Sequence, residues 1–343
     1  MTRKVNRQWH LAARPVGLIK ESDFNWVEAP IPIPGEGEIL VRNVYLSLDP
    51  TNRTWMNKEE TYLPAMAIGD VMRGITIGVV EDSNNENFQQ GDLVTGILGW
   101  QDYAVTDGRG LTILPKGLPV PMVIFLSVLG FIGLTAYFGL LDIGKPKSGE
   151  TLVVSAAAGA VGSLVGQIGK IKSCRVIGIA GTEEKCRWIT EELGFDASIN
   201  YKTESVHESL RKHCPNGVDI YFDNVGGKIL DTVLGHINLK ARIVLCGMIS
   251  QYNAIEPVPG PYNFHRILTK RARVEGFIVI DYVNRADEAL SDLISWMVED
   301  KIKYQVDVVD GLENVPKVIN KLFDGSNKGK LIVKVSEEPS SDS

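Results

Sequence analysis

The sequence predicts an α/β protein in which a β-rich domain is combined with a doubly wound parallel sheet. Three observations lead to this prediction: short alternating apolar stretches up to about residue 120, a regular alternation of strands and helices after Gly149, and a glycine-rich segment directly after the first of those strands. A chain of 343 residues has room for about two domains.

The composition, with 44% hydrophobic and 23% charged residues, is typical of soluble globular proteins. A net charge of −6 gives no basic field for a polyanion, so we expect no nucleic-acid partner. The longest apolar stretch, residues 120–141, is interrupted by proline and glycine, which indicates a buried helix rather than a membrane span. The amino terminus lacks the apolar run of a signal peptide and the four cysteines form no CxxC pair, so we expect a cytoplasmic protein with reduced thiols.

The first 120 residues have the pattern of an antiparallel β domain. Glu38–Leu48 and Gly74–Val80 alternate as half-buried strands do. Turns rich in glycine and proline, such as Pro30–Gly37 and Gly91–Gly99, separate these stretches.

Beyond Gly149 the chain alternates short apolar strands with helical patterns, as a parallel sheet with crossover helices requires. Ser205 and Glu208 have the spacing of a capping box, and Gly194 lies where a helix is expected to stop. The expected strands are Thr151–Ser155, Arg175–Ala180, Ala197–Tyr201, Val218–Asp223, Ala241–Cys246 and Val274–Ile280, and the expected helices are Ala160–Ile171, Glu183–Leu193, Ser205–His213 and Lys228–Ile237.

The last part of the chain is expected to return to the first domain. A helix near Asp287–Ile302 precedes Tyr304–Val335, for which we expect one more helix and a closing strand, Lys330–Val335. Residues 336–343 are too polar to pack and are expected to form a flexible tail.

The strand TLVVS is followed directly by Ala157-x-Gly159-x-x-Gly162, a dinucleotide fingerprint whose first glycine is alanine. Gly159 would let backbone amides approach a pyrophosphate, and Gly162 would let the helix lie close to the strand. The alternative is that these small residues only pack a helix on a sheet. The strand–turn–helix context favours a cofactor site.

The second strand ends in Gly181 and Thr182, where an NAD-specific site would place a carboxylate to hold the ribose 2′-OH. Lys185 follows, where a cation can reach a 2′-phosphate, so the sequence favours NADP. The alternative for Lys185 is a solvated helix residue whose charge is shared with Glu183 and Glu184.

No metal site is expected. The five histidines form no HxxxH or HExxH spacing, and neither they nor the cysteines cluster as zinc ligands do. A segment resembling a phosphate loop ends in Lys145 followed by Pro146, which offers neither a hydroxyl nor an amide N–H, and no GxSxG elbow is present.

Several long motifs identify a family resemblance over almost the whole chain. They include YLSLDPTNR at Tyr45–Arg53, LGFIGLTAYFGLLDIG at Leu129–Gly144, LGFDASINYKT, YFDNVGGK, CGMISQYN and GSNKGK. With these motifs the sequence resembles the zinc-independent medium-chain dehydrogenase/reductases, in particular the prostaglandin reductase / leukotriene B4 12-hydroxydehydrogenase group and its bacterial NADPH-dependent curcumin reductases.

The resemblance implies a GroES-like catalytic domain formed by residues 1–125 and 304–335, a Rossmann NADP-binding domain at 126–303, and a homodimer. The zinc-dependent branch uses Cys and His ligands in its catalytic domain, whereas residues 1–120 contain no cysteine and only His10. By position, the pyrophosphate would meet Gly159, Ala160, Val161 and Gly162, the 2′-phosphate would meet Lys185 with Gly181 and Tyr201 beside it, and the rest of the cofactor would meet Asn224, Cys246, Gly247, Met248, Ile249, Ser250, Tyr252, Phe277, Ile278, Val279 and Asn327.

These positions also have structural alternatives. Tyr201 would otherwise be a core residue at a strand end, Asn224 a turn former, and residues 277–279 ordinary sheet core. In addition, many relatives carry Tyr after the Asp-Pro of LSxDP, whereas this chain has Thr51 and Asn52.

The reaction expected without a metal is hydride addition to the β-carbon of an α,β-unsaturated ketone or aldehyde, because the charge then spreads onto the carbonyl oxygen as an enolate. Tyr252 is the expected hydrogen-bond donor or proton donor, and Tyr62 is a second candidate. Tyr252 would otherwise be structural, with solvent supplying the proton. Met66, Ile68 and Tyr262 are candidates for an apolar wall.

Two other functions remain open from the sequence. The first is a quinone reductase or a zinc-free ketone/alcohol oxidoreductase on the same scaffold, and the second is an NADPH-binding sensor with little turnover. The SQYN turn around Tyr252 favours the enone reductase.

Overall fold

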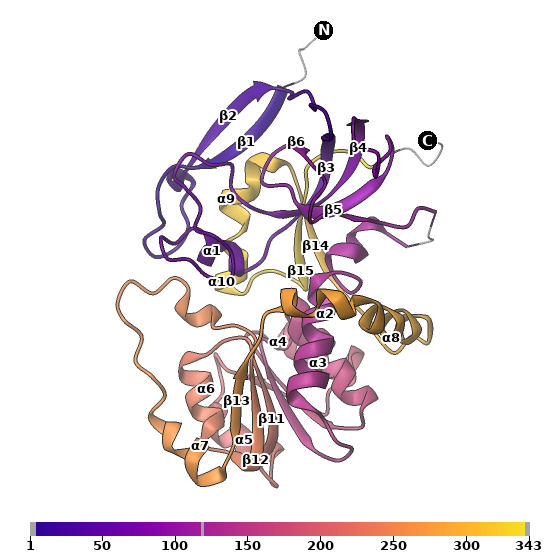
Figure 1. The fold of residues 1–343 in the computed structure, drawn as a ribbon. Helices are drawn as coiled ribbons and strands as arrows, with labels where there is room; N and C mark the ends of the chain where they lie inside the picture. Colours follow the sequence, from indigo (N-terminus) through magenta and orange to yellow (C-terminus); the bar gives the residue numbers. More distant parts are fainter. Residues whose placement is uncertain (1–4, 118–119, 340–343) are drawn as a thin grey trace. The chain divides into compact units, whose positions relative to one another are not determined.

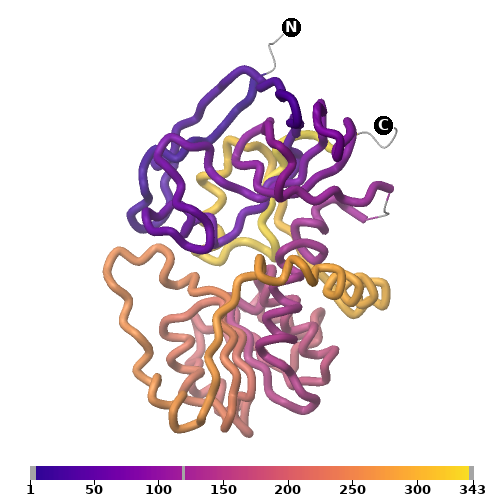
Figure 2. Tube along the Cα trace, in the orientation of Figure 1, coloured from indigo at the N-terminus to yellow at the C-terminus, as the bar shows by residue number. Residues whose placement is uncertain are grey.

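The computed structural model describes residues 5–117 and 120–339, and the chain divides into two compact units. The β-rich unit comprises residues 1–126, 306–327 and 331–343, and the parallel-sheet unit comprises 127–305 and 328–330. The part of the expected tail beyond residue 339 lies outside the described residues. Figure 2 traces the chain, with its indigo beginning and its yellow end both in the β-rich unit.

The β-rich unit contains an antiparallel pair and a larger sheet. The pair is β1 (Val5–Leu11) with β2 (Phe24–Pro30). The larger sheet has the order β14-β15-β3-β4-β5-β7, with β6 also paired to β3. Its strands are β3 (Ile39–Ser47), β4 (Ile75–Ser83), β5 (Leu93–Ile97), β6 (Tyr103–Thr106), β7 (Thr112–Ile113), β14 (Val306–Asp310) and β15 (Lys330–Lys334).

The two strands expected in the first 120 residues correspond to β3 and β4, which pair antiparallel. After residue 304 the prediction was incomplete, because β14 was not expected and the single expected helix is two short ones, α9 (Val315–Val318) and α10 (Lys321–Asp324). β14 lies at the end of its sheet, and its side chains are half-buried or exposed, so its apolar signal is weak. The other helical segments of this unit are Glu21–Asp23, α1 (Thr51–Trp55), Met122–Leu126 and Leu312–Asn314.

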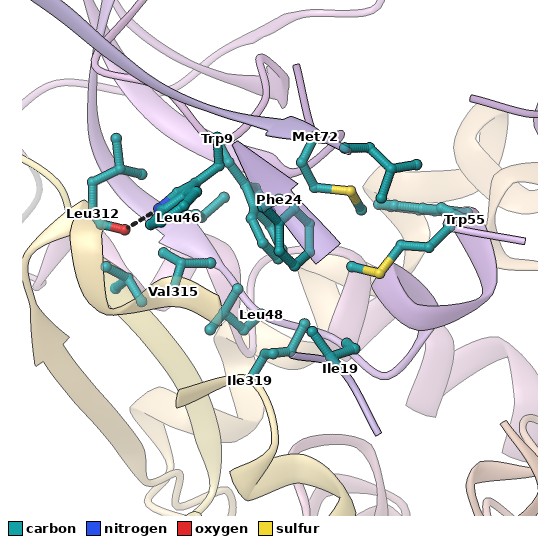
Figure 3. Packing of buried hydrophobic residues seen from close by; sticks show 14 of the residues in the cluster. Trp9, Ile19, Phe24, Leu46, Leu48, Trp55, Met72, Leu312, Val315 and Ile319 are labelled. Carbon is teal, nitrogen blue, oxygen red and sulfur yellow. Dashed lines mark hydrogen bonds between the residues drawn. The ribbon is translucent and has the colours of Figure 1, made fainter. Parts of the chain in front are cut away.

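One hydrophobic core joins the two ends of the chain within the β-rich unit (Figure 3). Trp9 of β1 donates its indole N–H to the carbonyl oxygen of Leu312 at 2.8 Å. Side chains from β1 and β2 and from residues 312–335 belong to the same buried cluster. The labelled members include Phe24, Leu48, Val315 and Ile319.

The parallel-sheet unit has six strands in the order β10-β9-β8-β11-β12-β13, and all printed pairs are parallel. In chain order this is 3-2-1-4-5-6, so the predicted doubly wound sheet is confirmed. The strands are β8 (Thr151–Ser155), β9 (Arg175–Ala180), β10 (Ala197–Asn200), β11 (Val218–Asp223), β12 (Ile237–Leu245) and β13 (Arg273–Gly276).

Two strands of this sheet differ from the prediction by more than one residue at one end. β12 begins at Ile237, where the last helical residue was expected, and β13 ends at Gly276 instead of Ile280. Residues Val279–Arg285 instead form a 3₁₀ helix. A short apolar run does not distinguish these two states by periodicity, which explains the error at Phe277–Ile280.

Helices cover both faces of this sheet: Figure 1 shows α5, α6 and α7 on one side and α3 on the other. Ser205 accepts a hydrogen bond from the Glu208 amide at the start of α5, and Gly194 follows a helical segment with φ of 71°, as expected. No helix of the described residues is both long and apolar enough to cross a membrane. The helical segments are α2 (Phe131–Phe138), Gly139–Gly144, α3 (Ala160–Ile171), α4 (Glu183–Arg187), Trp188–Glu192, α5 (Val206–His213), α6 (Gly227–Leu234), Ile249–Gln251, Tyr262–Phe264, α7 (His265–Lys270) and α8 (Ala286–Val298).

Candidate cofactor and catalytic site

The turn between β8 and α3 forms a close glycine-lined bend. Gly159 precedes α3 in an extended conformation, and α3 begins at Ala160. A Cβ at Gly162 would lie 2.4 Å from the Ala156 carbonyl oxygen, so only glycine allows this approach of helix and strand end. Gly159, Ala160 and Val161 are half-buried while Gly162 is buried.

This bend fits a dinucleotide pyrophosphate. The first amides of a helix have no intrahelical acceptor, and here they lie at the carboxyl end of the central strand of a parallel sheet. The residues Gly159, Ala160 and Val161 are only half-buried, and the positive end of the α3 dipole favours negative charge at this position.

The tip of β9 gathers the residues expected to recognise a 2′-phosphate. A Cβ at Gly181 would lie 3.0 Å from the Tyr201 ring and 3.3 Å from the Cε atom of Lys202, so both side chains lie against this tip. Tyr201 is 43% exposed, which rules out the core alternative. Thr182 caps α4 by accepting from the Lys185 amide at 3.2 Å.

The two carboxylates expected to share the charge of Lys185 also have other partners. Glu183 accepts a hydrogen bond from the Asn200 side chain at 3.0 Å. Glu184 pairs with Lys328 at 2.5 Å, and the hydrogen bond from Lys328 holds the pKa of Glu184 below its usual value. The sequence reasoning missed Lys202, although the NYK run placed a cation directly after Tyr201.

The carboxyl end of β11 is organised around Asp223, which is fully buried. Its Oδ1 atom accepts hydrogen bonds from the Tyr221 hydroxyl at 2.7 Å and from the amides of Val225 and Gly226, both at 2.9 Å. Burial nevertheless raises the pKa of this carboxyl group. These contacts fix the turn that carries Asn224.

Asn224 is held to β8 by two hydrogen bonds. Its side-chain amide donates to the Ser155 carbonyl oxygen at 2.7 Å, and its backbone N–H donates to the Ser155 hydroxyl at 2.9 Å. Asn224 therefore shapes the turn, as its alternative interpretation stated, at the same sheet edge as the glycine bend.

The segment from Cys246 to Tyr252 is fixed against this turn. The amides of Cys246 and Gly247 donate to the Asp223 carbonyl oxygen, at 2.9 and 3.1 Å. The Ser250 hydroxyl donates to the Val225 carbonyl oxygen at 2.6 Å. The Tyr252 hydroxyl accepts a hydrogen bond from the Met248 amide at 3.1 Å, which sets the position of the phenol.

A groove of about 490 Å³ opens beside Tyr252. The aromatic ring of Phe277 lies edge-on to that of Phe222, with 6.4 Å between the ring centroids. Ile249, Ser250 and Val279, which were expected to contact the cofactor, do not line this groove. Its lining residues are Leu245, Cys246, Gly247, Met248, Tyr252, Gly276, Phe277, Ile278 and Asp281.

Comparisons with known proteins agree with this geometry. Residues 7–114 match a family model described as the N-terminal domain of oxidoreductase, and residues 160–299 match one described as zinc-binding dehydrogenase. The chain is 48% identical over 336 residues to the NADPH-dependent curcumin reductase of Escherichia coli (strain K12), covering 96% of this chain and 97% of that protein. The chain belongs to the medium-chain dehydrogenase/reductase family.

Other members of this family are also similar. The NADP(+)-dependent 2-alkenal reductase of Nicotiana tabacum is 41% identical, with 97% of this chain and 98% of that protein covered. The crystal structure of CurA from Vibrio vulnificus in complex with NADPH is matched with a TM-score of 0.93 and 47% identity, over 97% of this chain and 100% of that chain.

The other residues that were predicted to contact the cofactor or the substrate lie in both units. Tyr62 and Asn327 belong to the β-rich unit, where Tyr62 is 41% exposed and Asn327 is buried. Met66 is buried in the core of that unit, whereas Ile68 is exposed. Tyr262 is 84% exposed in the parallel-sheet unit.

Across residues 5–117 and 120–339, no group of three or more His, Cys, Asp or Glu side chains is arranged to hold a metal ion. All four cysteines are free thiols, and burial raises the pKa of Cys246 to about 12.

Proposed function

We propose that this protein reduces the carbon–carbon double bond of α,β-unsaturated ketones and aldehydes with NADPH. The observation that carries the proposal is the position of the Tyr252 hydroxyl, fixed by the Met248 amide beside a groove at the carboxyl edge of the dinucleotide-binding sheet. The curcumin and 2-alkenal reductases, which cover nearly the whole chain, support the substrate class.

In this proposal the cofactor is held at three places in the parallel-sheet unit. The backbone from Gly159 to Gly162 binds the pyrophosphate, and Lys185 binds the 2′-phosphate beside Gly181 and Tyr201. Asn224, Cys246–Tyr252 and Phe277–Val279 complete the site in this unit. The absence of a carboxylate at the tip of β9 supports NADPH over NADH.

When bound, NADPH supplies a hydride. Tyr252 donates a hydrogen bond to the substrate carbonyl oxygen, where negative charge develops as the β-carbon is reduced. The Met248 amide donates to the same phenol oxygen, which stabilises any charge that Tyr252 acquires by giving up its proton. The one proton that completes the reduction reaches the α-carbon from Tyr252 or from water.

We further propose that the β-rich unit is a GroES-like catalytic domain formed by both chain ends. The core shared by β1, β2 and residues 312–335 supports this arrangement. The four thiols support the cytoplasm as the location.

A homodimer formed along β13 is part of the proposal. β13 is the last strand of its sheet among the described residues, and apolar side chains around it are exposed, including Leu268 at 80% and Val283 at 46%. Light scattering after size exclusion tests this point, and a monomer at micromolar concentration would contradict it.

The activity test follows absorbance at 340 nm with NADPH or NADH and one acceptor from each class: an enone, a quinone and a saturated ketone. We expect enone-dependent oxidation of NADPH and little reaction of the saturated ketone. NADPH binding without oxidation by any acceptor would refute the reductase and support a sensor.

A further inference from the structure

The groove beside Tyr252 carries one charged residue in an otherwise uncharged lining. Of the nine described residues that line it, only Asp281 is of a type that is charged at neutral pH. The lining residues that precede it in the sequence include Phe277 and Ile278, whose side chains are apolar. The groove therefore combines a largely apolar surface with a single carboxylate.

The wall that carries Asp281 is fixed by aromatic packing. Asp281 lies in a short 3₁₀ helix, and its amide donates to the Ile278 carbonyl oxygen at 3.1 Å. The next residue, Tyr282, stacks on Phe138 with 4.6 Å between the ring centroids. The ring of Phe277 lies edge-on to the same tyrosine, with 6.3 Å between the centroids. These contacts hold the backbone around Asp281 in place at the groove.

The carboxylates near Asp281 are neutralised, whereas its own is not. Glu275 pairs with Arg273 at 3.2 Å, and Asp142 pairs with Arg285. Asp281 is exposed, and the described part of the chain supplies neither a cation nor a hydrogen-bond donor to its carboxylate. Its negative charge is therefore offset by no protein group within bonding distance.

The charge of Asp281 acts beyond its own side chain. Burial raises the pKa of the Tyr282 hydroxyl, and nearby negative charges, that of Asp281 among them, raise it further, while Arg285 opposes the increase. A sphere of about 490 Å³ is about 10 Å across, which is close to the ~8–10 Å over which salt screens a charge under physiological conditions. A molecule in the groove consequently lies within the field of Asp281.

This field distinguishes ligands by their charge. A carboxylate brought into the groove is repelled by Asp281, an ammonium group is attracted, and an uncharged group is affected little. Apolar walls strengthen both effects, because they exclude water that would screen the charges. Neither effect requires direct contact with Asp281.

We propose that Asp281 is a specificity-determining residue, which makes the groove select uncharged or cationic α,β-unsaturated carbonyl compounds and disfavour those that carry a carboxylate. The proposal rests on the proposed enone reduction, because an acceptor whose carbonyl oxygen meets Tyr252 lies in the groove that Asp281 lines.

The test uses three benzylideneacetones that differ only in the group on the ring: a carboxymethyl group, its methyl ester, and a trimethylammoniomethyl group. The kcat/KM of each is measured with wild type, Asp281→Asn and Asp281→Lys at saturating NADPH. Variant and wild type are compared for one acceptor at a time, so that differences in intrinsic reactivity cancel. Asp287→Asn, which removes the same charge at an exposed position outside the groove, is the matched control.

We expect Asp281→Asn to raise kcat/KM for the carboxylate about 5- to 20-fold and to lower it for the ammonium compound by a similar factor, with the ester changed about twofold at most. Asp281→Lys should go further and reverse the wild-type order of the two charged acceptors. Discrimination by the wild type should shrink between about 0.05 M and 0.5 M NaCl, because salt screens the interaction.

The outcomes separate the two proposals. A wild-type protein that does not reduce the uncharged ester refutes the proposed function and the selection that depends on it. An active wild type in which Asp281→Asn changes all three acceptors by the same factor, whether or not the NADPH dissociation constant changes with them, refutes only the role of Asp281. An equal effect of Asp287→Asn, or discrimination that does not depend on salt, also overturns that role.

Discussion

Replacing Tyr252 with phenylalanine removes one oxygen atom and tests the proposed chemistry most directly. The phenol is the donor to the developing enolate oxygen, and hydrogen bonds to charged groups contribute about 1.5–3 kcal/mol, with donors to reacting oxyanions at about 2.7–4 kcal/mol. A loss near 2.7 kcal/mol corresponds to about 10²-fold in kcat.

The same change also leaves the Met248 amide without its acceptor at 3.1 Å. Met248 is only half-buried, so water can replace the phenol oxygen, and we expect the free energy of unfolding to fall by less than about 1 kcal/mol. The KM for NADPH should therefore change little.

The assay is initial-rate oxidation of NADPH with a saturating enone, with urea denaturation of each variant as the check on folding. Tyr304→Phe, at a half-buried tyrosine outside the groove, is the matched control. An unchanged kcat in Tyr252→Phe would refute the role of Tyr252 as a hydrogen-bond donor. If NADPH affinity and the free energy of unfolding both fell together with kcat, Tyr252 would have a structural role instead.

Three further predictions follow from the same unit. Lys185→Ala should weaken NADPH binding about 10- to 100-fold in calorimetric titration while NADH binding changes about threefold at most, and equal losses would show that Lys185 does not contact the 2′-phosphate. Gly162→Ala should lower the free energy of unfolding by about 1–3 kcal/mol in urea denaturation, because its Cβ would lie 2.4 Å from the Ala156 oxygen, and a wild-type midpoint would contradict that close approach. Cys214 is buried and its burial raises the pKa of its thiol to about 12, so Cys214 should resist alkylation by iodoacetamide at pH 8 in mass spectrometry. An unfolded thiol loses its proton near pH 8.5 while the native Cys214 thiol keeps its proton, so this group should lower the free energy of unfolding as pH rises above about 9, and a Cys214→Ala variant with the same pH dependence would contradict this.

The sequence predicted the parallel sheet well because buried strands and capped helices leave strong local signals. TLVVS and VDIYFD each contain three consecutive apolar residues, and the observed β8 and β11 have the expected bounds. The α3 helix also matches, from Ala160 to Ile171. The errors lie where apolar residues do not alternate with a clear period, as at Phe277–Ile280, or where a half-exposed edge strand such as β14 carries a weak pattern.

Contacts between residues that are distant in the sequence could not be predicted from local sequence patterns. No local pattern shows that Thr51 meets Tyr62 or that Lys202 lies against Gly181, because both contacts depend on how loops close. The same holds for Glu184, whose partner Lys328 is far along the chain. The glycines of the bend between β8 and α3 were predictable because backbone geometry within a few residues requires them.

The shared core of the β-rich unit sets an order of events during synthesis. Trp9 and Phe24 leave the ribosome first, but Leu312, Val315 and Val333, which pack in the same cluster, leave it last. Residues 127–305 contain the complete parallel sheet and emerge before these late partners. The parallel-sheet unit should thus reach its native structure during translation. Until the last residues are synthesised, Trp9 and Phe24 lack their packing partners and stay exposed, so β1 and β2 are the segment most in need of chaperone protection.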